Sequence, residues 1–170
     1  KRQQGLHPRL TLTDMYNVLD ALRLGRALTA RERITHADGL VSVLAELHDR
    51  LDALVLQAYG WSDLAPALVG KPGGTLPWPE KPAAQAEAEE ELLQRLVALN
   101  ALRAAEANLA AVRARLVDAV ADFRRQQTLA ERGFAAQAVY ERARQAREAA
   151  QANVEAAEAM LKNAQDQVSF

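Results

Sequence analysis

Apolar residues recur at helical spacing over most of the 170-residue chain. In residues 11–25 they lie on one helical face, which carries Met15, Val18, Leu19 and Leu22. The spacing predicts a short amphipathic helix that Thr13 caps and that ends at Gly25.

The words TARE at residues 29–32 form a capping box, in which Thr29 and Glu32 satisfy each other's backbone amides. A long helix of about 45 Å is expected to begin there and to end at Gly60. Its apolar positions recur at steps of three and four: Leu40, Val41, Leu44, Leu47, Leu51, Leu54, Val55 and Ala58.

Residues 60–82 hold five of the six prolines and four of the eight glycines, which predicts a surface loop without regular structure. Trp61 and Trp78 both lie in this loop. One interpretation is that they pack the loop onto the helices, and the other is that they contact a partner.

Residues 83–132 contain neither Gly nor Pro, so one helix of about 70 Å is expected. A coiled-coil seam follows from the alternating steps of Leu102, Ala105, Leu109, Val112, Leu116, Ala119 and Phe123. A second seam, with one extra four-residue step at Ala150 to Val154, consists of Val139, Ala143, Ala146, Ala150, Val154, Ala157, Leu161, Ala164 and Val168.

Gly133 is the lone glycine between the two seams, and it predicts the hinge of an antiparallel hairpin. The expected fold is therefore all-α. A helical subdomain at 1–103 precedes a coiled-coil hairpin at 104–170, whose tip lies near 132–136.

Composition supports a folded chain, because 49% of the residues are apolar and 25% are charged. The net charge is −1 for residues 1–103 and zero for residues 104–170, so bulk attraction to nucleic acid is not expected. No apolar run is long enough for a membrane helix. The segment KRQQGLHPRL lacks an initiator Met and an apolar signal core, which indicates a fragment or a processed chain.

Residue types that carry chemistry are sparse. The chain has no cysteine, and its three histidines form no spaced ligand pair, so no metal site is expected. His48 precedes Asp52 by one helical turn, which predicts an exposed hydrogen-bonded pair. Neither a nucleophile elbow nor a glycine-rich cofactor motif is present, so we expect no enzyme activity and no cofactor.

One charge feature stands out around the expected tip. Within residues 124–147, two acidic residues, Glu131 and Glu141, oppose Arg124, Arg125, Arg132, Arg142, Arg144 and Arg147. Six cations against two anions give a local charge of +4. Either these arginines cover small alanines on a solvated hairpin end, or they dock on an acidic or phosphate surface.

The first part of the chain resembles a known family. Between residues 7 and 103, that family's C-terminal helical region is matched by HPRLTLTDMYNVLDALR, LTARERITHADGLVSVLAELHDRLDALVLQAYGW and ELLQRLVALNALRAAE. The family is the MmeI-like class I S-adenosylmethionine-dependent DNA methyltransferases of bacterial restriction or defence systems. The resemblance implies a scaffold for DNA target recognition, with the catalytic and cofactor residues outside this chain.

The remainder resembles a different family. Residues 107–165 are similar to the α-hairpin of HlyD-like periplasmic adaptor proteins, also called membrane fusion proteins. In that family, Arg, Leu and Ser at fixed spacing meet a TolC-type channel. Arg125 and Leu129 match this pattern, whereas Ala136 replaces the serine.

Three functional hypotheses follow. The leading one is a non-catalytic helical module that acts on DNA beside a separate methyltransferase catalytic domain in the cytoplasm. The alternative is an interaction hairpin that docks on a TolC-type outer-membrane channel in the periplasm or cell envelope. The third is a composite of two unrelated segments without a single native role. Exposed seams also allow a homo-oligomer through the coiled coil.

Overall fold

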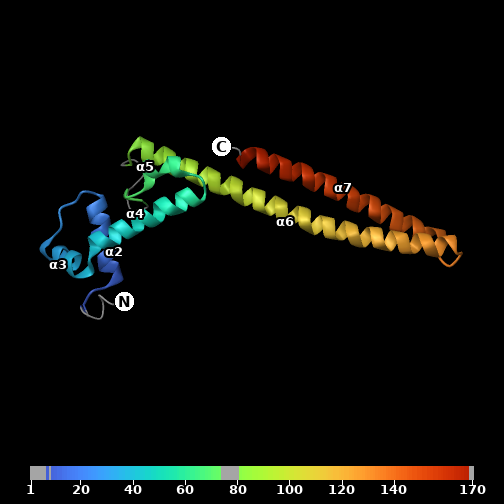
Figure 1. Cartoon of the computed structure of the whole chain (residues 1–170), viewed down its shortest axis with the longest axis horizontal. Coiled ribbons are helices and arrows are strands. Elements are labelled where there is room, and N and C mark those ends of the chain that lie inside the picture. Colours follow the sequence, from blue (N-terminus) through green and yellow to red (C-terminus); the bar gives the residue numbers. More distant parts are fainter. Residues whose placement is uncertain (1–6, 8, 74–80, 169–170) are drawn as a thin grey trace. The chain divides into compact units, whose positions relative to one another are not determined.

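A computed structural model describes residue 7, residues 9–73 and residues 81–168. The elements in these residues are all helical: α2 (Leu12–Arg23), α3 (Ala30–Gly39), α4 (Val41–Ala58), η1 (Ser62–Leu64), α5 (Ala65–Leu68), α6 (Ala83–Glu131) and α7 (Gln137–Val168) (Figure 1). The all-α prediction is confirmed. The chain divides into two compact units, residues 1–92 and residues 93–170, and α6 continues through this division and past residue 103.

Helix α2 begins earlier than expected. The Oγ1 of Thr11, not that of Thr13, accepts a hydrogen bond of 3.0 Å from the backbone amide of Asp14. Thr11 has extended backbone angles, as an N-cap residue requires, whereas Thr13 is already helical. Of the predicted apolar face, Met15, Val18 and Leu19 are buried, but the prediction for Leu22 was wrong: it is 38% exposed, and Ala21 is buried instead.

The core of the first unit forms where α2 meets the start of α4. Val18 and Val41 are almost completely buried, with 1% and 0% of their surface exposed. They pack with Leu10, Met15 and Leu19, and Leu28, Leu44 and Ala45 close the cluster. Burial of each such side chain contributes about 1.5–3 kcal/mol, so this small cluster holds α2 against α4.

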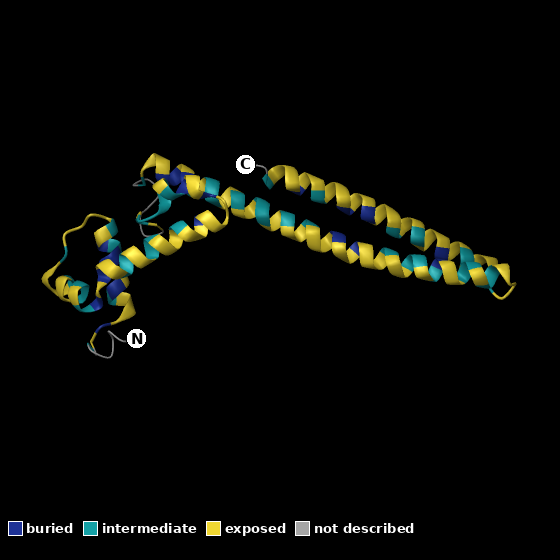
Figure 2. Cartoon of the chain, viewed as in Figure 1, coloured by how far each residue is buried: buried dark blue, intermediate teal, exposed yellow. Residues whose placement is uncertain are grey.

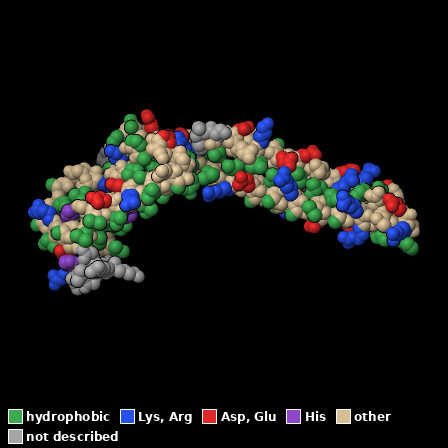
Figure 3. All heavy atoms as spheres, in the orientation of Figure 1, with side chains coloured by type: hydrophobic (Ala, Val, Ile, Leu, Met, Phe, Trp, Pro, Cys, Tyr) green, Lys and Arg blue, Asp and Glu red, His purple; other side chains and the backbone are tan. Residues whose placement is uncertain are grey.

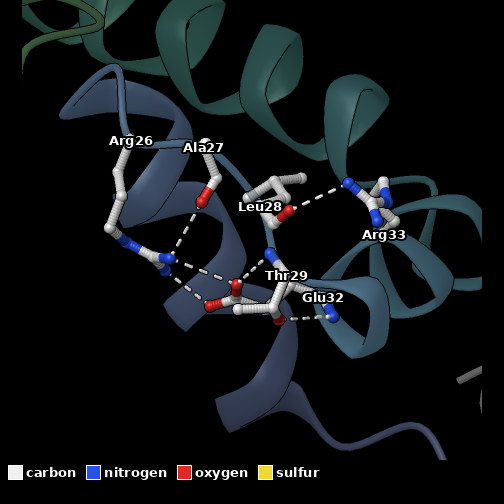
Figure 4. Close-up of polar contacts among 6 residues, drawn as sticks. All are labelled: Arg26, Ala27, Leu28, Thr29, Glu32 and Arg33. Carbon is white, nitrogen blue, oxygen red and sulfur yellow. Dashed lines mark hydrogen bonds and ion pairs between the residues drawn. The ribbon is translucent and has the colours of Figure 1, made fainter.

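The predicted capping box is present at the start of α3 (Figure 4). The Glu32 carboxylate accepts from the Thr29 amide at 2.8 Å, and the Glu32 amide donates to Thr29 Oγ1 at 3.3 Å. Arg26 adds a two-pronged contact with the same carboxylate, at 2.5 and 3.2 Å. Hydrogen bonds from Arg26 and then from Thr29 lower the pKa of Glu32 to about 2.

The long helix expected from Thr29 to Gly60 is instead two helices. Leu40 adopts a left-handed conformation with φ of 51°, and this residue separates α3 from α4. The preceding Gly39 lies so close to α2 that a Cβ there would be 3.0 Å from Cγ of Met15. The break therefore lets the backbone at Gly39 approach α2.

The end of α4 follows the prediction. Gly60 has φ of 77°, and the Trp61 amide donates to the Leu56 carbonyl at 2.8 Å, which is the Schellman arrangement. The segment that follows is more regular than expected, because η1 and α5 occupy residues 62–68. Trp61 is buried and stacks on Tyr59, as the packing interpretation predicts, whereas Trp78 lies outside the described residues.

Helices α6 and α7 form the expected antiparallel hairpin (Figures 1 and 2). Close to the turn, Phe123 contacts Tyr140 with ring centroids 5.6 Å apart. Farther from the turn, Arg113 donates to Glu158 at 2.8 Å. Between the helices lies a narrow core of Leu109, Val112, Val154 and Ala157, which Leu116 and Leu161 extend.

The chain reverses at Gly133, the expected hinge. Its φ is 75°, and its amide donates to Ala130 at 2.9 Å while the Phe134 amide donates to Leu129 at 2.8 Å. These bonds make a second Schellman arrangement, which ends α6 and satisfies its last carbonyls. The chain therefore does not continue through Gly133 as one uninterrupted helix.

The first seam is confirmed, since all seven of its positions are buried or half-buried. The second seam is partly wrong, because Val139 and Ala146 are exposed. Tyr140 and Arg147 take their places, so the inward positions become Tyr140, Ala143, Arg147, Ala150, Val154, Ala157, Leu161, Ala164 and Val168. These steps alternate three and four throughout, and the extra four-residue step disappears.

Candidate functional site

The hairpin tip is the candidate site, and exposed arginines surround it. Arg124, Arg125 and Arg132 lie in or just after the last turns of α6, and Arg142 lies near the start of α7. All four are exposed, and their side chains form no ion pair or hydrogen bond within the described part of the chain. In Figure 3, Lys and Arg side chains gather over this end of the hairpin.

The other two arginines of the predicted cluster have structural partners. Arg147 is half-buried, and its guanidinium carbon lies 4.4 Å from the centroid of the Phe123 ring. Arg147 and Arg144 also lie 3.6 and 3.4 Å from the carboxylate of Glu148. Arg147 therefore belongs to the seam, and Arg144 is exposed but paired along its own helix.

Charge at the tip is lower than the sequence count suggests. Glu148 lies one residue beyond the window counted from the sequence, so residues 124–148 hold six arginines and three glutamates, or +3. This charge is concentrated on the four arginines that lack partners among the described residues. They can contact a ligand without breaking an existing ion pair there.

Apolar residues complete the tip. Leu129 is half-buried in the last turn of α6, one turn after Arg125, and Ala136 directly precedes α7. Phe134 follows Gly133 in the turn and is 80% exposed. The sequence-based prediction of the tip did not include Phe134, although an aromatic residue directly after a helix-ending glycine was a usable signal.

The histidines form isolated polar pairs. His7 Nδ1 lies 3.4 Å from Asp38, and His36 Nε2 lies 2.9 Å from Ser42. His48 does not pair with Asp52 as expected, because its Nε2 lies 2.9 Å from the hydroxyl of Tyr16 on α2. The packing of α2 on α4 therefore gives His48 a partner on the other helix in place of Asp52 on its own helix. Within residues 7, 9–73 and 81–168, no three potential metal ligands come together.

A shallow cleft of about 640 Å³ lies between the start of α2 and α3. Its lining includes Arg9, Arg31, Asp14 and Asp38, together with His7, Leu10, Ile34 and Thr35. Two arginines and two aspartates line it, so their charges balance and offer no net charge to attract a ligand. The tip of the hairpin has the clearer electrostatic character.

Comparison with known proteins identifies no relative: no family model, curated protein or solved structure matches the chain. Among the described helices, none has the length and apolar character needed to cross a bilayer.

Proposed function

We propose that this chain is a non-catalytic helical module that supports DNA target recognition by a bacterial restriction or defence methyltransferase. Its hairpin works as an arm, and the tip binds DNA phosphates in the cytoplasm beside a separate catalytic domain. The observation that carries this proposal is the group of four exposed tip arginines, which have no partners among the described residues. The resemblance of residues 7–103 to the methyltransferase helical region supports the same assignment.

The physical basis is the fit between guanidinium and phosphate. Arginine presents a planar fork of donors that binds phosphate through two hydrogen bonds. The hairpin is long, since α7 alone has 32 residues and measures about 48 Å. The guanidinium groups at its tip are therefore far from the open end of the hairpin. The near-neutral chain as a whole gives little non-specific attraction, so contact is expected at the tip alone.

Charge reversal tests the proposal. The full chain and its Arg124→Glu/Arg125→Glu variant are titrated into fluorescent duplex DNA at several salt concentrations. Wild-type affinity should fall as salt rises. The variant should bind more weakly, and its salt slope should be smaller by about 0.9 for each phosphate that it no longer neutralises.

A matched control separates local contact from net charge. Arg103→Glu/Arg115→Glu makes the same charge change at exposed positions on α6 away from the tip. This control should retain most of the binding. Equal decreases in affinity for both variants, or unchanged binding of the tip variant, would contradict the proposal.

A second candidate is the interaction hairpin of an envelope adaptor, and Phe134 favours it. An exposed aromatic residue at the end of the hairpin that also carries Arg125 and Leu129 is typical of a surface that docks on protein. On this hypothesis the chain captures a TolC-type outer-membrane channel, and Phe134→Ala abolishes capture. Retention of the purified channel by the immobilised chain, without DNA binding, would replace the first proposal.

A further inference from the structure

Phe134 is an exposed aromatic residue on a fixed backbone. It is the most exposed large hydrophobic side chain in the described part of the chain. Its amide is held by the Leu129 carbonyl at 2.8 Å, and the left-handed Gly133 precedes it. The turn thus has a defined, hydrogen-bonded backbone, which reduces the conformational entropy to be lost on binding.

Phe123, the other phenylalanine of the hairpin in the described residues, packs inside it. Phe123 is buried, contacts Tyr140 and lies under the guanidinium of Arg147. Phe134 has no such ring or cation contact among the described residues. Its ring faces are therefore available, although a helix-ending turn commonly packs this position against the residue five before it, here Leu129.

Arginines lie at the same end of the hairpin as this ring. Arg132 lies two residues before Phe134, and Arg124 and Arg125 lie two to three helical turns before it. Proteins that bind single-stranded nucleic acid combine these two features, in which cations follow the phosphates and aromatic rings stack on bases. Paired bases inside a duplex offer no free face, whereas unpaired bases do.

We infer that Phe134 stacks on an unpaired base of the DNA whose phosphates the tip arginines bind, so that the preferred ligand is locally unpaired DNA. This inference rests on the proposed function, because it assumes that the tip binds DNA. It adds the class of DNA and the residue that distinguishes it.

The test compares three fluorescent probes of equal length: a duplex, a duplex with a central unpaired bubble, and a single strand. The full chain should bind the bubble and the single strand more tightly than the duplex. Phe134→Ala should weaken binding to both by about tenfold or more while leaving duplex binding nearly unchanged. Phe134→Trp should preserve the preference, because stacking needs only an aromatic face.

Val117→Ala is the matched control, since it truncates an exposed apolar side chain that lies on α6, before the turn. It should bind all three probes like the wild type. Circular dichroism of each variant verifies that the helices are intact.

The outcomes distinguish the inference from the proposed function. If Phe134→Ala retains full preference for unpaired DNA while Arg124→Glu/Arg125→Glu weakens all binding, the stacking inference fails and the phosphate contact stands. If the arginine variant binds every probe like the wild type, the proposed function fails. Binding to vesicles of phosphatidylserine and phosphatidylcholine, without binding to any DNA probe, would overturn both in favour of a lipid surface.

Discussion

Replacing Gly133 by alanine tests the turn on which the hairpin depends. An added Cβ would meet no atom within 4 Å, so the substitution creates no clash. The cost comes from the backbone alone, because φ of 75° is a conformation that alanine disfavours by about 1–2 kcal/mol. Gly133→Asn should cost less than half of this, since asparagine adopts the left-handed conformation more readily.

Thermal unfolding followed by far-UV circular dichroism measures the effect. The melting temperature should fall by about 4–8 °C for each kcal/mol of destabilisation if the second unit, residues 93–170, melts separately. Gly73→Ala is the control, because it adds a methyl group in equally open space without a positive φ. It should be neutral or stabilising by about 0.4–1 kcal/mol. Equal effects of Gly133→Ala and Gly73→Ala, or of Gly133→Ala and Gly133→Asn, would refute the reasoning.

Two further predictions concern side chains with identified partners. Arg147→Met keeps an apolar stem in the seam but removes the cation above Phe123, so it should destabilise the hairpin by about 0.5–1 kcal/mol in urea unfolding, whereas Arg144→Met should change stability by less than about 0.5 kcal/mol. Equal destabilisation by the two variants would show that the ring contact contributes nothing. Glu32 has a pKa lowered from 4.5 to about 2, chiefly by Arg26, so its contribution to stability is complete above pH 4.5 and is lost as the pH falls towards 2. The stability difference between wild type and Glu32→Gln should therefore shrink over that interval, and a difference independent of pH would contradict this assignment.

Local signals were the part of the fold that could be predicted well from the sequence. Contacts within a few residues form the capping box of Thr29 and Glu32 and the helix ends at Gly60 and Gly133. Such features can be recognised in the sequence itself. The break at Leu40 was not predicted, although Gly39 directly precedes it and the apolar positions assigned to the long helix begin only at Leu40. It depends on the approach of Gly39 to Met15, which are far apart in sequence.

The register of the second seam failed for a related physical reason. Selecting only aliphatic positions favoured Val139 and Ala146 and required an irregular step. Tyr140 and Arg147 restore regular spacing, because a tyrosine ring and an arginine stem fill a seam while their polar ends reach its edge. Regularity of spacing was thus the better guide than the hydrophobicity of each residue.

The candidate site shows the same division between composition and geometry. Counting residues located the basic tip, but the count treats Arg147 and Arg124 as equivalent. The helical face separates them: Arg147 points into the seam and covers Phe123, whereas Arg124 is exposed and unpaired within the described chain. If Arg147 left Phe123 to contact a ligand, the hairpin would lose the stabilising contact between them. On the proposed function, the four exposed arginines and Phe134 make the contacts with the ligand, so mutations there should change binding with little effect on folding.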